Sequence, residues 1–258
     1  MATKRVDFKE ALGVLEDLVG NNQMSSFEVL AIKRERNRKS FIRNTGVITR
    51  PEMVTEEILE QFKPFRSDLF NKDDFSNLTL DHFEVAGGYV DDYGIPRDVI
   101  PIRDHSGELV AFSFRDIRDD YDSDFKYIAT PDFDKDRVLY NMHNAKSYGE
   151  KLPLILVEGF KSVWRLQSLG LDNCIAIMGS KISEGQVSLL QSFAFEGIIV
   201  MLDNDKAGKE GTESIIKWLD KRMPIYPVYI TEVNDKGKGL DPSDLLPERL
   251  IEYVSYAC

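Results

Sequence analysis

Two short apolar runs, each ending abruptly in acidic residues, most constrain how this chain can fold. The first covers residues 154–157 and is followed by Glu158-Gly159, and the second covers residues 198–202 and is followed by Asp203-Asn204-Asp205. Runs of this length, rich in Ile, Val and Leu, are typical of strands buried on both faces of a parallel sheet. Each run leads into a helix-like segment, so the pattern predicts repeated strand–turn–helix units.

The acidic turns predict a metal site. Turns that follow parallel strands lie together, outside the carboxyl ends of those strands. Glu158, Asp203 and Asp205 should therefore meet in one crevice as catalytic side chains, where they would repel one another unless protons or a cation were bound. Hard oxygen ligands partly open to solvent suit Mg²⁺ or Mn²⁺ holding a phosphate. The simpler alternative is two strand ends with solvated acids.

The same alternation extends through the second half of the chain. We expect strands over residues 154–157, 173–178, 197–202 and 225–230, and helices over residues 160–169, 183–193 and 206–221. Such a series predicts an α/β fold with a mainly parallel sheet covered by helices. Upstream, apolar runs over residues 99–104 and 109–115 flank Ser106-Gly107 and predict a β-hairpin.

The sequence pattern predicts helices in the N-terminal part of the chain. Apolar residues at helical spacing predict amphipathic helices over residues 6–19 and 55–70, with another beginning near residue 25 and running to residue 39. A basic cluster over residues 33–39 could contact a phosphate backbone or could be a solvated helix face, and the pattern does not choose.

Charge and composition limit the function classes. The formal net charge is −11, which argues against strong nucleic-acid binding, although residues 1–50 hold ten Lys/Arg against six Asp/Glu. Metal ions would offset part of this acidity. Two cysteines and three scattered histidines cannot build a Cys-rich zinc module. No membrane-spanning run and no signal peptide are evident, so we expect a soluble, cytoplasmic protein.

These motifs also carry a family resemblance. Glu158-Gly159 after one strand, with Asp203-x-Asp205 and Ala207-Gly208 after a later one, resembles the Toprim domain of bacterial-type primases, type IA and II topoisomerases and some nucleases. The block just upstream is similar to the segment that precedes Toprim in bacterial-type primases. It contains Lys126-Tyr127, a following proline, Lys135-x-Arg137 and Leu139-Tyr140.

The upstream block separates the Toprim families, because topoisomerases and Toprim nucleases do not place it there. The resemblance therefore implies the catalytic core of a bacterial or bacteriophage-type DNA primase, which makes short RNA primers by nucleotidyl transfer during DNA replication. The implied partners are single-stranded DNA, ribonucleoside triphosphates, a replicative helicase and a zinc-binding module absent from this chain. The implied cofactor is Mg²⁺ or Mn²⁺.

The resemblance also assigns residues. Lys126, Lys135 and Arg137 match basic positions that would hold the triphosphate or the template, through charge-assisted hydrogen bonds to phosphates. Arg103 and Arg115 are looser candidates for the same role. The late segment around Asp241-Pro242-Ser243-Asp244 resembles a further acidic motif, which implies Asp241 as a fourth metal ligand beside Glu158, Asp203 and Asp205.

Two positions depart from the family pattern. The family usually has an acid four positions after the Toprim glutamate, where this chain has Ser162, and its late motif usually reads Asp-Pro-Asp, where this chain has Ser243. Both departures put a second metal ion in question.

The implied architecture is a Toprim-type parallel-sheet domain preceded by a smaller mixed α+β lobe. We expect a helical N-terminal segment over residues 1–74, a basic lobe over 75–151, the Toprim domain over 152–247 and a C-terminal helix or tail over 248–258. Two other functions stay open on the residues alone. A Toprim nuclease would use the same acids to cut DNA, and a non-catalytic module would bind nucleic acid or a helicase with a decayed site.

Overall fold

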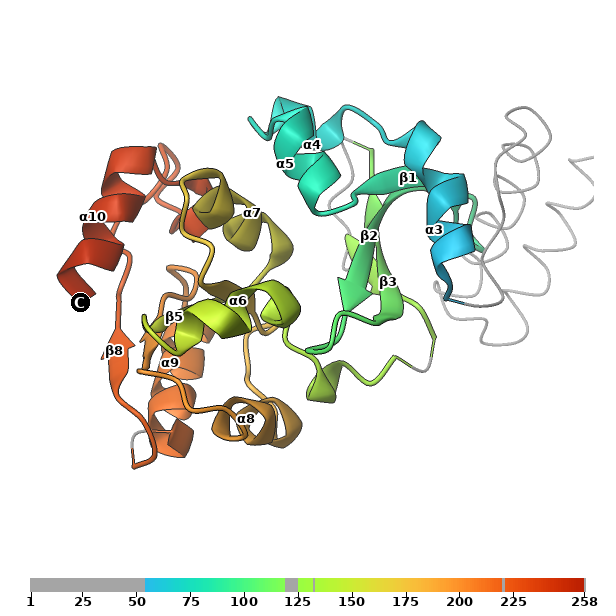
Figure 1. Ribbon diagram of the computed structural model, residues 1–258. Coiled ribbons are helices and arrows are strands. Elements are labelled where there is room, and N and C mark those ends of the chain that lie inside the picture. The colour runs from blue at the N-terminus through green and yellow to red at the C-terminus, as the bar shows by residue number, and fades with distance from the viewer. Residues whose placement is uncertain (1–53, 119–124, 132, 220, 258) are drawn as a thin grey trace, which may run out of the picture.

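The computed structural model describes residues 54–118, 125–131, 133–219 and 221–257. The helices expected over residues 6–19 and 25–39 lie outside this range. The described chain contains two four-stranded sheets, one antiparallel and one parallel, which belong to two neighbouring lobes (Figure 1). The expected fold class, a parallel-sheet domain preceded by a mixed α+β lobe, is confirmed.

The first lobe is built on the antiparallel sheet. Its strands, in spatial order, are β1 (Ala86–Val90), β2 (Pro96–Arg103), β3 (Leu109–Asp116) and β4 (Tyr127–Ala129). The expected hairpin is the β2–β3 turn, in which Asp104 Oδ1 accepts hydrogen bonds from the N–H groups of Ser106, Gly107 and Glu108. Gly107 has a φ of +98°, a left-handed conformation that glycine adopts without steric cost.

Short helices precede this sheet in the chain. They are α3 (Glu56–Phe62), the 3₁₀ turn η1 (Lys63–Phe65), α4 (Leu69–Lys72) and α5 (Asn77–His82). Of these, α3 and η1 pack against β1, and α5 packs against helix α7 (Phe160–Ser168). The continuous helix expected over residues 55–70 is therefore interrupted. Pro64 lies in the 3₁₀ turn directly after α3, and proline lacks the N–H that would continue the α-helical ladder.

The second lobe is built on the parallel sheet, with spatial order β6-β5-β7-β8. Its strands are β5 (Leu154–Val157), β6 (Cys174–Ala176), β7 (Ile198–Val200) and β8 (Ile225–Pro227), and its crossover helices are α7 (Phe160–Ser168), α8 (Glu184–Gln191) and α9 (Lys206–Leu219). Every residue of β5, β6 and β7 is buried, as expected for strands covered by helices on both faces. The alternation read from the sequence is confirmed, with β6, β7 and β8 shorter than expected.

Four further segments complete the second lobe and join it to the first. The turn η2 (Lys135–Arg137) and helix α6 (Met142–Gly149) connect the two sheets, and η3 (Pro242–Asp244) and α10 (Pro247–Ala257) end the described chain. None of the described helices is long and apolar enough to cross a membrane.

An aromatic cluster packs the two lobes together around Trp164 of α7. The Trp164 ring makes edge contacts with Phe70 and Phe75 of the first lobe, at centroid distances of 4.9 and 5.6 Å. Its indole N–H donates to the Tyr140 hydroxyl over 2.9 Å, which satisfies the polar atoms of both buried side chains. Helix α7 therefore contributes both to the core and to the turn after β5, where the first acidic residue lies.

Candidate active site

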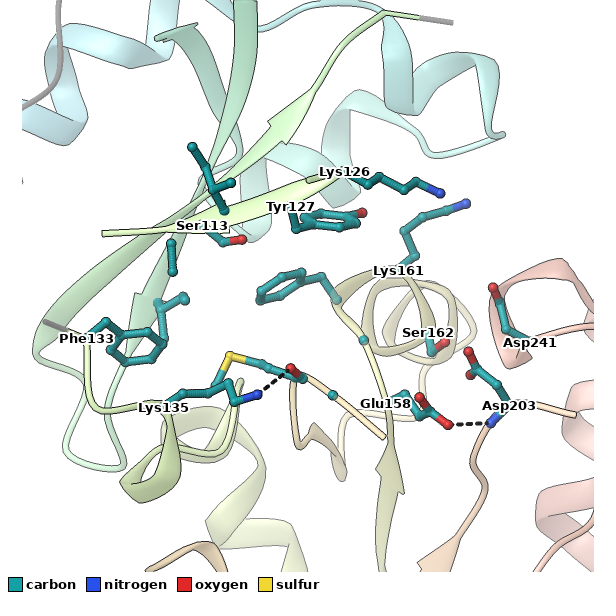
Figure 2. Close-up of a pocket in the computed structure, with 17 residues that line it drawn as sticks. Ser113, Lys126, Tyr127, Phe133, Lys135, Glu158, Lys161, Ser162, Asp203 and Asp241 are labelled. Carbon is teal, nitrogen blue, oxygen red and sulfur yellow. Dashed lines mark hydrogen bonds between the residues drawn. The ribbon is translucent and has the colours of Figure 1, made fainter. Parts of the chain in front are cut away.

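Two of the expected acids meet where β5 and β7 end. These strands are parallel neighbours, with Leu156 opposite Val200, so the turns that follow them lie side by side. Glu158 follows β5, Asp203 follows β7, and the Asp203 N–H donates to Glu158 Oε1 over 3.3 Å (Figure 2). The structure thus brings together carboxylates that are 45 residues apart in the chain.

Both carboxyl groups have pKa values near neutral. Burial raises the pKa of Glu158 to about 7. The hydrogen bond from the Asp203 N–H lowers this pKa, and the negative charges of Asp205 and Asp241 raise it. Burial, followed by the negative charge of Glu158, raises the pKa of Asp203 to about 8. Two partly buried acids whose pKa values are both raised by burial form a site that favours a proton or a cation.

The other two expected acids border this pair but are held by the backbone. Asp205 is exposed, and its Oδ1 accepts from the N–H of Gly208 over 2.7 Å at the start of α9. Asp241 faces the same cavity as Glu158 and Asp203, and its Oδ1 accepts from Ser243 N and Ser243 Oγ over 2.7 and 2.5 Å. Asp205 is not among the residues that line this cavity.

A glycine in α9 makes room for the acidic pair. A Cβ built on Gly208 would lie 2.1 Å from the carbonyl oxygen of Asp203 and 3.0 Å from Glu158 Oε1. Any larger residue would displace the turn that carries Asp203. The Ala207-Gly208 pair noted in the sequence therefore has a steric reason.

The donor set fits a hard divalent cation by its chemistry. Across the described ranges, no group of three or more His, Cys, Asp or Glu side chains has an arrangement that could hold a metal ion. Glu158 and Asp203 nevertheless supply adjacent oxygen donors with excess negative charge, and Asp241 adds a third carboxylate to the same cavity. Oxygen donors of this kind match Mg²⁺ and Mn²⁺, which keep several waters or phosphate oxygens as ligands.

The cavity lies between the lobes and has a volume of about 470 Å³. Acids line it on the side of the parallel sheet and lysines line it elsewhere (Figure 2). Both lobes contribute lining residues: Ile102, Ser113, Lys126, Tyr127, Ile128, Ala129, Phe133, Lys135, Glu158, Gly159, Phe160, Lys161, Ser162, Met178, Gly179, Asp203 and Asp241. A cavity of this size and lining is typical of a small-ligand site.

Two of the expected basic residues reach this cavity. Lys126 precedes β4, lines the cavity and extends beside Lys161 (Figure 2). Burial, followed by the positive charges of Arg115 and Lys161, lowers the pKa of Lys126. Lys135 lies on the opposite side, where its ammonium donates to the carbonyl of Met178 over 3.5 Å. Its Nζ would be 3.2 Å from a Cβ on Gly179, so the small residue leaves space for the lysine.

The three expected arginines are placed differently. Arg103 is occupied by ion pairs with Glu84 and Glu56, at 2.7 and 2.6 Å. Arg115 lies over the Tyr127 ring, 5.3 Å from its centroid, at the edge of the cavity. Arg137 is exposed and pairs with Asp134 over 3.1 Å. None of these arginines lines the cavity.

Lys161 and Tyr127 line the cavity and were not assigned roles from the sequence. Lys161 lies in the first turn of α7, three residues after Glu158. The available signal is its place in the first turn of the helix that directly follows the acidic turn, where a cation lies near the glutamate. Ser162, where the family usually has an acid, is buried at the cavity wall.

Comparison with known families divides the chain in the same way as the fold. Residues 54–146 match the family described as the DNA primase catalytic core, N-terminal domain, and residues 153–229 match the Toprim domain. The resemblance read from the sequence is confirmed in both halves.

Curated relatives carry the same description. A DNA primase of Aquifex aeolicus is 34% identical over 166 residues, which cover 62% of this chain and 32% of that protein. A DNA primase of Staphylococcus epidermidis is 30% identical over 152 residues, which cover 58% of this chain and 24% of that protein. The chain thus spans between about a quarter and a third of the length of these relatives.

Solved structures agree on the fold. The zinc-binding and RNA polymerase domains of the Aquifex aeolicus primase match with a TM-score of 0.60 at 22% identity, covering 96% of this chain and 66% of that one. A DnaG primase catalytic domain bound to single-stranded DNA matches with a TM-score of 0.62 at 16% identity, covering 86% of this chain and 80% of that one.

Proposed function

The chain belongs to the DNA primase catalytic-core family, and we propose that it synthesises short RNA primers on single-stranded DNA by metal-dependent nucleotidyl transfer. One observation carries this proposal. A partly buried acidic pair faces one cavity of nucleotide size together with lysines contributed by both lobes. Joining a nucleotide to a primer requires negative charge on phosphates to be offset while two reactants are aligned.

Glu158 and Asp203 would hold the divalent ion, with Asp205 and Asp241 as further ligands. When bound, Mg²⁺ or Mn²⁺ would supply charge neutralisation at the phosphates. Glu158 is either a ligand or the group that accepts the proton of the primer 3′-hydroxyl. A carboxylate with a pKa of about 7 suits either role at neutral pH.

The basic residues would hold the phosphates. Lys126 and Lys135 line the cavity on opposite sides. Their ammonium groups can donate hydrogen bonds to phosphate oxygens of the triphosphate or the template. Arg115 at the cavity edge and Arg137 on the exposed η2 turn would contact phosphates that extend beyond the cavity. Arg103 would bind a phosphate only if the template displaced Glu56 and Glu84 from its guanidinium group.

The partners follow from the relatives. The solved catalytic domain bound to single-stranded DNA supports a single-stranded template for this chain, and the relatives' name supports ribonucleoside triphosphate substrates. A replicative helicase and a zinc-binding module remain predictions of the family resemblance. So does the division into segments 1–74, 75–151, 152–247 and 248–258, and so does an origin in a bacterium or its phage.

The test is RNA synthesis on single-stranded DNA with Mg²⁺ or Mn²⁺, measured de novo and by extension of a dinucleotide primer. We expect product from the wild-type protein and at least a hundredfold less from Glu158→Gln, because that change removes a carboxylate at the reaction centre. Glu150→Gln is the matched control, since Glu150 is exposed at the end of α6, near the amino end of β5.

Full product from Glu158→Gln, or no product from the wild-type protein in either assay, would contradict the proposal. The same reactions without nucleotides test for cleavage of DNA. The relatives and the solved structures reported above are primases, so neither a Toprim nuclease nor a non-catalytic binding module is favoured.

A further inference from the structure

Lys161 is a cationic side chain of the cavity that has no part in the proposed function. It lies in the first turn of α7 and lines the same cavity as Glu158. Figure 2 shows its side chain extending beside that of Lys126, so that ammonium groups from the two lobes point in the same direction. Two positive charges placed together repel each other and favour an anion between them.

The anion present in the structure is Asp73. Its Oδ2 lies 3.1 Å from Lys161 Nζ, and the two side chains are 28% and 41% exposed for the lysine and the aspartate. Ion pairs with this much solvent access stabilise a fold little, so this pair can be exchanged for a stronger one. A phosphate group offers more negative charge and more acceptor oxygens than a carboxylate.

The position of the lysine pair indicates which phosphate it binds. Glu158 and Asp203, which would hold a divalent ion, lie near Asp241, and the ammonium groups of the two lysines lie together in another part of the same cavity (Figure 2). A ligand that contacts both must extend a chain of phosphates from the acids toward the lysines. The volume of about 470 Å³ suits one nucleotide, whereas a nucleic-acid strand would need an open groove.

We propose that Lys161, together with Lys126, binds the terminal phosphates of the incoming nucleoside triphosphate, and that Asp73 holds the Lys161 ammonium until those phosphates replace it. This inference rests on the proposed function, because it assigns the orientation of the substrate in that active site. Ser162 beside it is neutral, so Lys161 has no competing carboxylate on the next residue.

The test is direct binding of a triphosphate analogue whose α–β bridging oxygen is replaced by a methylene, in Mg²⁺ and without template, by calorimetry. We expect Lys161→Ala to weaken binding about tenfold, the effect of one lost charge-assisted hydrogen bond. Lys161→Arg should retain most of the affinity. Asp73→Asn should tighten binding, because it removes the competing anion, and Lys151→Ala should bind as the wild type does.

Lys151 is the matched control because it is an exposed lysine before β5, away from the carboxyl ends of the strands. A nucleoside monophosphate should bind the wild type and Lys161→Ala equally, since it has no terminal phosphates. In primer extension, Lys161→Ala should raise KM for nucleotide with little change in kcat. Single-stranded DNA affinity should not change.

Three results would overturn the inference. Triphosphate binding that is unchanged in Lys161→Ala would do so, and so would equal weakening of monophosphate and triphosphate. Weaker binding in both Lys161→Ala and Asp73→Asn would show that the ion pair acts only structurally. Primer synthesis by the same wild-type preparation distinguishes failure of this inference from failure of the proposed function. If the wild type makes primers but Lys161→Ala binds the triphosphate analogue normally, only this inference is refuted. If the binding results are as expected but the wild type makes no primers, only the proposed function is refuted.

Discussion

Glu158 and Asp203 hold protons more tightly in the folded protein than they would in the unfolded chain. Their pKa values rise from ordinary values of 4.5 and 3.8 to about 7 and about 8, with burial as the main cause. Between the ordinary and the raised values the folded state therefore binds more protons than the unfolded state. By linkage, the stabilising contribution of these protons is complete below about pH 4 and is lost as the pH rises through 7 to 8.

We expect the protein in a metal chelator to lose on the order of 2 kcal/mol of unfolding free energy between pH 6 and pH 8.5 through this pair, about half of what the full pKa shifts would give, because both carboxyl groups are partly open to solvent. Asp203→Asn, which carries no charge to neutralise, should remove most of that loss. Added Mg²⁺ should stabilise the wild type more at pH 8.5 than at pH 6, because protons no longer compete. Denaturant unfolding at both pH values measures this, and an equal pH dependence in Asp203→Asn would contradict it.

Gly208 and Gly159 offer a test of steric space within the same motif. Gly208→Ala should destabilise the protein by about 1–3 kcal/mol and reduce primer synthesis, since its Cβ would lie 2.1 Å from the Asp203 carbonyl. Gly159→Ala should change stability by less than about 0.5 kcal/mol, because no atom lies within 4 Å of its Cβ. Thermal unfolding and primer extension of both variants decide the matter, and equal destabilisation would refute it.

Helix α9 begins at the acidic turn, so one residue there has a structural contact and a proposed chemical role. Asp205 accepts the Gly208 N–H, which is an N-terminal hydrogen bond of that helix. Asp205→Asn keeps an acceptor oxygen, so we expect unchanged stability but at least tenfold less primer synthesis. Asp205→Ala should lose the activity and also about 1 kcal/mol of stability. Normal synthesis by Asp205→Asn would remove Asp205 from the ligand set.

Elements were more predictable from the sequence than side-chain directions. Apolar runs and acidic turns located β5, β7 and the meeting of Glu158 with Asp203, because burial and parallel topology follow from pattern. Directions depend on contacts between segments far apart in the chain. Arg103 turns toward Glu56, which is 47 residues away, and Lys161 turns toward Asp73 in the other lobe. No local pattern specifies such pairings.

At the scale of the whole molecule, Trp164 determines how firmly the lobes pack. Trp164→Ala should cost about 3–5 kcal/mol, because it leaves a cavity among Phe70, Phe75 and Tyr140. Trp164→Phe should cost about 1–3 kcal/mol, since it leaves the buried Tyr140 hydroxyl without its donor. Trp218→Phe is the control, because Trp218 is 48% exposed, and it should be nearly neutral. Denaturant unfolding that ranks these variants otherwise would contradict this.

The cavity belongs to neither sheet alone. Lys126 comes from the chain before β4, whereas Glu158 and Asp203 come from the chain after η2. A break between β4 and η2 would therefore place Lys126 on one fragment and both carboxylates on the other. We expect neither fragment alone to synthesise primers. When mixed, the two fragments should regain primer synthesis only if they bind each other. The segment between β4 and η2 is therefore a suitable place to split the protein, with primer synthesis as the measure of fragment association.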